Sequence, residues 1–223
     1  MNFGRGWRVD LAELADVCHD AGSLLCVDLM QGLGVVPAEL DAWGVDFATA
    51  GPHKWLCAPR GVGLFFVAKS ARHRLRPLEP GWASVAHRGE WERLDLVWDD
   101  SARRFEGGSP NEAGILALGA SLSVLLDAGI DRVWSYVDGL CGRLVEQLER
   151  IDGARVLSDR SRNGRSAVVT FVLDDTDAGE IATKLERDGF VCAARGGGIR
   201  VSPHGYIEES EVDAFVDAVA TIR

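Results

Sequence analysis

The sequence predicts an α/β domain that is followed along the chain by a smaller α+β domain. In the first part of the 223-residue chain, short apolar runs alternate with helical patterns, which is typical of strands and helices packed in layers. The later part mixes four short strand-like runs with two helical ones. A chain of this length suffices for one large or two small domains. We predict one domain over residues 1–125, including the helix that connects the two, and a second over residues 126–223.

The first predicted elements lead to an acid at the end of a strand. A helix is expected over residues 10–21, with apolar side chains on one face and a glycine at its end. The apolar run at residues 24–27 predicts a buried strand that carries Asp28 at its carboxyl end. A second strand is expected near residues 45–48, followed by a Gly/Pro turn and a further buried strand at residues 63–67.

The middle of the chain predicts a long loop and two long helices. Residues 69–103 contain tryptophans between prolines and glycines without a regular pattern, which indicates a loop at an active site or a dimer contact. Apolar residues recur at helical spacing over residues 111–128 and 131–150. The second domain is expected to contain strands at residues 155–157, 167–173, 190–193 and 199–201, and helices at residues 178–188 and 208–222.

Composition and charge exclude some classes of partner. Hydrophobic residues make up 47% of the chain and charged residues 26%, as in ordinary globular proteins. The formal net charge of −10, from 24 basic and 34 acidic side chains, argues against nucleic acid as a partner. We also expect no membrane association, because no apolar run approaches the ~20 residues of a spanning helix and no signal peptide is recognisable. A cytoplasmic location is the resulting expectation.

The five cysteines do not show the spacing of a disulfide framework. They are scattered without a Cys-x-x-Cys pair, so we predict buried apolar thiols and not disulfides. The cysteines and the five histidines also lack zinc-ligand spacing, and no metal is predicted.

Asp28, His53 and Lys54 each allow two interpretations when taken alone. An acid at the end of an apolar strand either caps the next helix or serves a site, and burial is costly unless a cation or strong donor meets it. A His-Lys pair in a Gly/Pro turn is either a solvated loop or a reactive lysine with a neighbour that positions it. Gln31 follows Asp28 closely and offers an amide donor near the same strand end.

Two residues later in the chain are further candidates. Arg200 lies in a glycine-led strand, where a guanidinium either stays on the surface or grips a carboxylate through two parallel hydrogen bonds. Ser109 precedes Pro110, and proline is favoured at the first position of a helix. We therefore predict that the Ser109 hydroxyl caps the helix that follows.

Four ordered blocks resemble the class V aminotransferase family of fold type I pyridoxal phosphate enzymes. That family also contains the cysteine desulfurases, kynureninase and isopenicillin N epimerase. The resemblance runs over essentially the whole chain. Its blocks are the strand with Asp28 and Gln31, Gly-Pro-His-Lys-Trp-Leu at 51–56, Arg-Phe-Glu-Gly-Gly-Ser-Pro-Asn at 104–111, and Gly-Ile-Arg-Val-Ser-Pro-His at 198–204.

The resemblance implies pyridoxal 5'-phosphate as the cofactor and a role for each residue of the first two blocks. Lys54 would form the Schiff base and, once freed, would remove the α-proton of the substrate as general base. Asp28 would keep the pyridine nitrogen protonated. Gln31 would donate to the phenolic oxygen of the ring, and His53 would position or tune the lysine.

By the same resemblance, Arg200 would bind the α-carboxylate of a small amino acid. The Ser109 hydroxyl would reach the cofactor phosphate of a neighbouring subunit, which implies a homodimer with a composite site. The expected reaction is that of an aminotransferase or a lyase.

Three positions depart from the family pattern. Gly51 stands where many relatives have a Ser or Thr that contacts the phosphate, and Ile207-Glu208 replaces an Asn-Thr pair that follows the arginine strand. Cys192 precedes Arg200 by eight residues but lies in a predicted inward-facing strand position. A persulfide-forming thiol needs exposure and a lowered pKa, so we do not expect this role for Cys192.

The resemblance also implies a longer chain. The part that carries the phosphate-binding turn and the aromatic residue over the ring would precede Met1, so we expect a fragment with exposed apolar surfaces. The alternative to an enzyme is an inactive remnant or a dimerisation scaffold of the family. A third hypothesis, a Schiff-base enzyme without cofactor, explains Lys54 but gives Asp28 and Gln31 no role.

Overall fold

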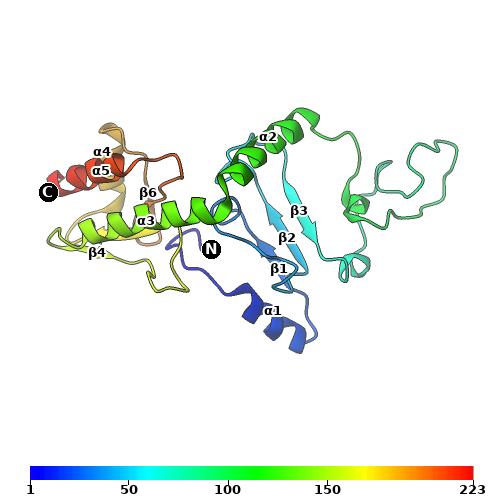
Figure 1. The fold of residues 1–223 in the computed structure, drawn as a ribbon, viewed down its shortest axis with the longest axis horizontal. Coiled ribbons are helices and arrows are strands. Elements are labelled where there is room, and N and C mark those ends of the chain that lie inside the picture. The colour runs from blue at the N-terminus through cyan, green and yellow to red at the C-terminus, as the bar shows by residue number, and fades with distance from the viewer. Residues whose placement is uncertain (223) are drawn as a thin grey trace. The chain divides into compact units, whose positions relative to one another are not determined.

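The computed structural model describes residues 1–222 and divides the chain into two compact units (Figure 1). We call Leu11–Met30 with Glu39–Ser121 the lysine unit. The arginine unit contains Met1–Asp10, Gln31–Ala38 and the chain from Leu122 onward. Both combine strands with helices, which confirms the predicted α/β class.

The lysine unit is built on a three-stranded mixed sheet. Its strands are β1 (Cys26–Asp28), β2 (Phe47–Ala50) and β3 (Leu64–Val67), in the order β1-β2-β3. β1 and β2 run parallel, whereas β2 and β3 are antiparallel. Helix α1 (Leu11–Asp20) buries Ala15 against Leu25, Val45 and Ala48. Gly22 ends this helix as predicted, with φ of 71° and its N–H donated to the His19 carbonyl.

The prediction of buried strands is wrong for β1 and in part for β3. Cys26 and Asp28 are exposed, and Phe65 of β3 is 40% exposed. β1 lies at the edge of the sheet, and no strand within residues 1–222 pairs with its outer side. An apolar run specifies that a strand can be buried, whereas its actual burial depends on what covers it.

The long loop and the two long helices are confirmed. Between β3 and α2 (Glu112–Ala128) the structure contains the short 3₁₀ helices η1 (Arg72–Arg74) and η2 (Ala102–Phe105) and an isolated bridge between Val85 and Trp98. Helix α3 (Ile130–Leu148) follows α2. Apolar side chains of α2 are exposed, among them Leu116 at 75%. In residues 1–222 no single helix is long and apolar enough to cross a membrane, and only the bent pair of α2 and α3 together has the required length and composition.

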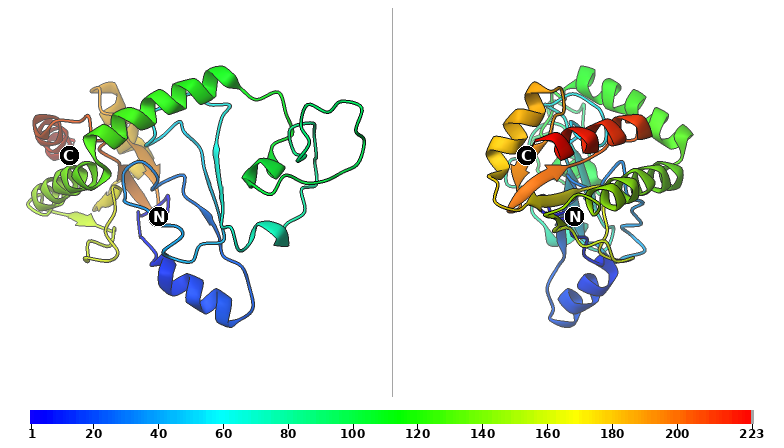
Figure 2. Two further views of the ribbon diagram at one scale, coloured as in Figure 1. Left: turned by 45° about the vertical axis from the view of Figure 1, so that its right-hand side comes forward. Right: turned by 90° about the vertical axis from the view of Figure 1, so that its left-hand side faces the viewer.

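The arginine unit contains a four-stranded antiparallel sheet. The strands β4 (Ala154–Val156), β5 (Val169–Leu173), β6 (Ala193–Arg195) and β7 (Gly198–Val201) lie in the order β4-β5-β7-β6. Helices α4 (Ala178–Arg187) and α5 (Glu209–Thr221) lie beside these strands (Figure 2). The ring of Phe171 is fully buried and meets Phe215 of α5 edge-on at 6.3 Å between centroids.

The first residues of the chain pack on this same sheet. Thr170 Oγ1 donates to the Gly4 carbonyl at 2.8 Å, and Ser158 Oγ donates to the Arg5 carbonyl at 2.6 Å. Both hydroxyls are buried, and burial makes an unsatisfied polar group costly, so these bonds hold the N-terminal segment in place. The N-terminal segment thus belongs to the same compact unit as the C-terminal part of the chain, whereas the sequence predicted one boundary at residue 125. The predicted division into two domains stays a prediction.

The cysteine prediction is wrong for two of the five thiols. Cys26 and Cys57 are exposed, Cys18 and Cys192 are partly buried, and Cys141 alone is buried; all five are free. Cys26 is exposed because it points to the face of β1 opposite Val27, and it is Val27 that packs against the core next to α1. Within residues 1–222 no group of three or more His, Cys, Asp or Glu side chains could hold a metal ion, and the absence of a metal stays a prediction.

Asp213 of α5 is expected to show a measurable pH dependence. Hydrogen bonds from Arg143 and then Gln147, at 2.6 Å each, lower its pKa from its ordinary value of 3.8 to about 2. Because the pKa is lower in the folded state, this carboxylate stabilises the fold above its ordinary pKa and loses that contribution as the pH falls toward 2. NMR titration of the carboxyl carbon should report a pKa near 2.

The Arg143→Ala variant should return the pKa of Asp213 toward its ordinary range. Arg150→Ala is the matched control, because Arg150 pairs with Glu146 and not with Asp213. An ordinary pKa of Asp213 in the unmodified protein would contradict this account.

Candidate functional site

Asp28 and the turn that holds Lys54 follow two neighbouring parallel strands. β1 ends at Asp28, whose Cα is paired with that of Thr49 near the end of β2, and the Gly51–Leu56 turn follows β2 directly. Leu29 N–H also donates to the Thr49 carbonyl at 2.8 Å, which extends the pairing past Asp28. Carboxyl ends of adjacent parallel strands meet at one edge of a sheet, where α/β proteins bind ligands. The structure thus brings Asp28 and the lysine turn to the same sheet edge.

The Asp28 carboxylate is only partly engaged. Its Oδ1 accepts the Met30 N–H at 2.7 Å, which is an Asx-type turn, and the residue is exposed. The local bond fixes the orientation of the side chain. Within residues 1–222 no cation pairs with Asp28, so its second oxygen stays available to a donor.

The lysine turn is fixed by its backbone and by two buried side chains. Cys57 N–H donates to the Lys54 carbonyl at 3.0 Å, and Ala58 N–H donates to that of Pro52 at 2.9 Å. Trp55 and Leu56 are buried next to Lys54, and Ser121 Oγ donates to the Leu56 carbonyl. Lys54 itself is exposed, as is His53. A hydrogen-bonded turn that presents an exposed amine is suited to reaction with a carbonyl compound.

Gly51 has a packing role that sequence reasoning did not identify. A Cβ at this position would lie 2.3 Å from Cε of Met30 and 3.3 Å from the imidazole of His53. A Ser or Thr here would require Met30 to move. Met30 Cε ends a flexible side chain that uses the space left by Gly51, a contact that no pattern in the sequence reveals.

The predicted cap of α2 is wrong. The helix begins at Glu112, and Asn111 is its capping residue, because Asn111 Oδ1 accepts the Gly114 N–H at 3.0 Å. The Asn111 amide also donates to the Gly61 carbonyl at 3.0 Å. Ser109 lies two residues earlier with φ of 46° and is exposed. The Ser109 hydroxyl does not cap the helix, so it is available for a contact with another group.

Arg200 and Gln31 belong to the arginine unit. Arg200 lies on β7, and its NH1 donates to the Phe3 carbonyl at 2.7 Å, while its buried Nε has no partner within residues 1–222. Burial, and next the charge of Arg195, lowers the pKa of Arg200. Gln31 is partly buried. Their proximity to Lys54 stays a prediction.

Partial desolvation opposes a nucleophilic role for two thiols, the exposed Cys57 and the partly buried Cys192. Desolvation raises the pKa of Cys57 and of Cys192, and for Cys192 the charge of Glu186 adds to the effect. Since the thiolate is the nucleophile, a raised pKa lowers the reactive fraction. This agrees with the expectation that Cys192 does not carry sulfur.

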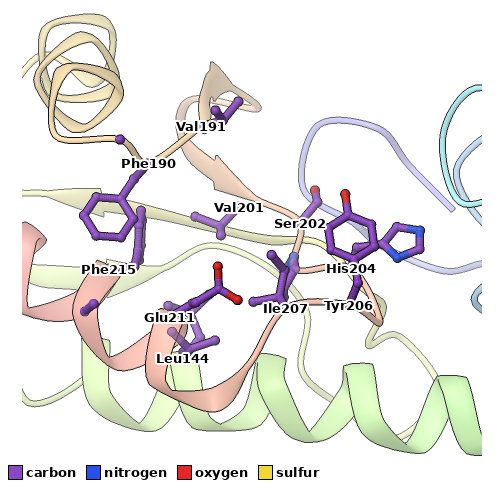
Figure 3. Close-up of a pocket in the computed structure, with 14 residues that line it drawn as sticks. Leu144, Phe190, Val191, Val201, Ser202, His204, Tyr206, Ile207, Glu211 and Phe215 are labelled. Atoms are coloured by element: carbon purple, nitrogen blue, oxygen red, sulfur yellow. The ribbon is translucent and has the colours of Figure 1, made fainter. Parts of the chain in front are cut away.

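The arginine unit also contains a cavity of about 500 Å³ that sequence reasoning missed (Figure 3). Its apolar wall includes Phe190 and Phe215, and His204 and Tyr206 stack at its rim with ring centroids 4.4 Å apart. None of the predicted site residues lines it. Part of its lining, including Pro203, His204 and Tyr206, comes from the segment that follows β7.

Comparison with known proteins shows to which family the chain belongs. A family model described as "Aminotransferase class-V" matches residues 4–215. The chain belongs to the class V aminotransferase family. This confirms the resemblance carried by the four sequence blocks. Bacillus subtilis "Uncharacterized aminotransferase YcbU" is 28% identical over 220 residues, which cover 99% of this chain and 57% of that protein.

Solved structures share the fold of this family member. Cysteine desulfurase CsdA from Escherichia coli matches with a TM-score of 0.84 at 25% identity, covering 98% of this chain and 56% of that one. The cysteine desulfurase from Thermococcus onnurineus matches with a TM-score of 0.87 at 21% identity, covering 99% and 57%. A C-DES mutant with glycine covalently linked to its PLP cofactor matches with a TM-score of 0.87 at 21% identity, covering 98% and 58%. The fold is therefore that of fold type I pyridoxal phosphate enzymes, and the chain spans somewhat more than half the length of these proteins.

Proposed function

We propose that this class V aminotransferase family member is a pyridoxal phosphate-dependent enzyme that acts on an amino acid through Lys54, as an aminotransferase or a lyase. The observation that carries the proposal is the placement of Asp28 and the Lys54 turn at the ends of adjacent parallel strands. A carboxylate with a free oxygen and an exposed amine at one sheet edge fit the ring nitrogen and the aldehyde of that cofactor.

Each residue has a defined task in this proposal. Pyridoxal phosphate, when bound, supplies a ring that withdraws electrons from the α-carbon of the substrate. The Asp28 carboxylate holds a proton on the ring nitrogen, and the Lys54 amine holds the cofactor aldehyde and later accepts the α-proton. His53, next to Lys54, orients the amine. Gln31 donates to the phenolic oxygen, and the Arg200 guanidinium orients the α-carboxylate of the substrate.

Two of the five thiols are poor candidates for carrying sulfur. Both Cys57 and Cys192 have raised pKa values, which disfavours formation of a persulfide. Ser109, which does not cap α2, is free to reach the phosphate in a partner subunit, so we include a homodimer in the proposal.

The experiment uses the low lysine content of the chain. Lys54, Lys69 and Lys184 are the only lysines in the sequence. The purified protein is incubated with pyridoxal phosphate, scanned for the absorbance of a lysine adduct, reduced with borohydride and mapped by mass spectrometry. Reduction onto Lys54 alone would support the proposal. No adduct, or equal labelling of the three lysines, would contradict it and favour an inactive remnant or scaffold of the family.

A further inference from the structure

One face of the sheet in the arginine unit concentrates positive charge. The strands β4 to β7 contain three arginines and no acid, namely Arg155, Arg195 and Arg200. This contrasts with the chain as a whole, whose formal charge is −10. A cluster of guanidinium groups on an acidic protein is a candidate binding site for an anion.

The register of the sheet places these arginines on the same side. Arg155 is paired with Val172, which is two residues from Thr170, and Thr170 is paired with Arg200. Alternate residues of a strand and directly paired residues of neighbouring strands share a face. Arg155 and Arg200 therefore share a face.

Arg195 reaches that face through the β6–β7 hairpin. Arg195 is paired with Gly198, and Gly198 is two residues from Arg200 on β7. Arg195 is thus the diagonal neighbour of Arg200, and side chains in this relation lie about 7–8 Å apart at their Cα atoms. Two long guanidinium side chains at this separation can grip the same small ligand.

The opposite face of the sheet is the one that the helices cover. Phe171 and Ile199 are paired across β5 and β7, both are fully buried, and Phe171 contacts Phe215 of α5. Phe171 follows Thr170, so it points away from the arginine face. The arginine face is contacted by the N-terminal segment at Gly4 and Phe3, through Thr170 and Arg200.

The positive charges on this face are not neutralised within the described chain. None of the ion pairs in residues 1–222 involves Arg155, Arg195 or Arg200. Arg200 donates only to a backbone carbonyl, and its buried Nε has no partner. The charge of Arg195 lowers the pKa of Arg200, after the larger effect of burial. Two repelling cations held next to each other without an acid are stabilised by an anion.

The hairpin that carries Arg195 is held in place by Arg5 and by its glycine turn. Arg5 Nε donates to the Gly196 carbonyl at 2.8 Å, and Gly196 and Gly197 have φ of 66° and 85°, which favours glycine in this turn. Gly198 has no side chain opposite Arg195, and a Cβ there would lie 2.3 Å from the Phe171 carbonyl oxygen. Arg195 is itself exposed, and β7 places no side chain directly opposite it.

We propose that Arg195 binds a second carboxylate, so that the substrate is an amino acid whose side chain ends in an acid group. Arg200 takes the α-carboxylate, as in the proposed function on which this inference rests, and the diagonal neighbour Arg195 takes the carboxylate of the side chain. Arg5 acts as a positioning residue, because its bond to Gly196 fixes the turn next to Arg195.

The test compares L-glutamate with L-glutamine, which have nearly the same shape but differ in the charge of the side chain. Binding to the protein without cofactor is followed by NMR titration of the arginine Nε–H signals. We expect L-glutamate to bind about 10- to 100-fold more tightly than L-glutamine, as is typical of a hydrogen bond between charged groups. Arg195→Gln should remove this preference, because it weakens the binding of L-glutamate far more than that of L-glutamine.

Two further variants separate specific binding from a general effect. Arg195→Lys keeps the charge and should retain part of the preference. Arg187→Gln, an exposed arginine at the end of α4, should not change it. Equal affinities for the two amino acids, no binding of L-glutamate, or the same loss in Arg187→Gln would overturn the inference. Labelling of Lys54 tests the proposed function separately, so the two proposals can fail independently.

Discussion

Lys54→Ala is expected to abolish the borohydride-stable attachment of pyridoxal phosphate to this chain. The exposed amine follows β2 directly and lies on a turn fixed by buried Trp55 and Leu56, which makes it the lysine best placed to react. Where α-proton exchange of an amino acid is measurable, its rate should fall by about 10²- to 10⁴-fold, the usual contribution of a positioned proton acceptor. Mass spectrometry of the reduced protein and deuterium exchange of the amino acid measure the two effects.

The other two lysines supply matched controls. Lys69 and Lys184 are exposed and lie outside the turn, so Lys69→Ala and Lys184→Ala should keep full attachment. Unchanged attachment in Lys54→Ala, with the label moved to Lys69 or Lys184, would show that the reaction is unspecific.

Phe171→Ala is expected to cause the largest loss of stability. The ring is fully buried on β5 and contacts Phe215 of α5, so its removal leaves a cavity between the sheet and the helix. Truncation of a buried phenylalanine costs about 3–5 kcal/mol in free energy of unfolding. Urea denaturation followed by circular dichroism gives the difference.

Phe3→Ala is the control for that measurement. Phe3 belongs to the same unit and is 56% exposed, and its backbone bond to Arg200 does not depend on its ring. We expect a loss below about 1 kcal/mol. Equal losses in the two variants would mean that the sheet and α5 do not form the core of this unit.

The sequence was most informative where local chemistry determines the structure. The helices were predicted to within a few residues, because apolar spacing and a terminal glycine such as Gly22 act locally. The lysine turn and Asp28 were located because an ordered set of blocks marks them. β6 was predicted too early in the chain: it begins at Ala193, next to a turn at Gly196 and Gly197 whose positive φ values set the hairpin.

Features that depend on distant contacts were missed. Asn111, and not Ser109, caps α2. The side chain of Asn111 is held at this position by its second hydrogen bond, to the distant Gly61 carbonyl. The exposure of Cys26 and Asp28 depends on what covers their face of β1, and the contact between Gly51 and Met30 depends on how two loops pack. The arginine face required the strand register, because Arg155 and Arg195 are far apart in the sequence.

The route of the chain has a consequence for how the protein can be dissected. The backbone passes from one unit to the other after Asp10, after Met30, after Ala38 and after Ser121. Neither unit is a contiguous stretch, so no single truncation excises one intact, and proteolytic cleavage of any one connection leaves the halves tethered by the others. Swapping the arginine unit with that of a homologue would require exchanging three separate segments at once.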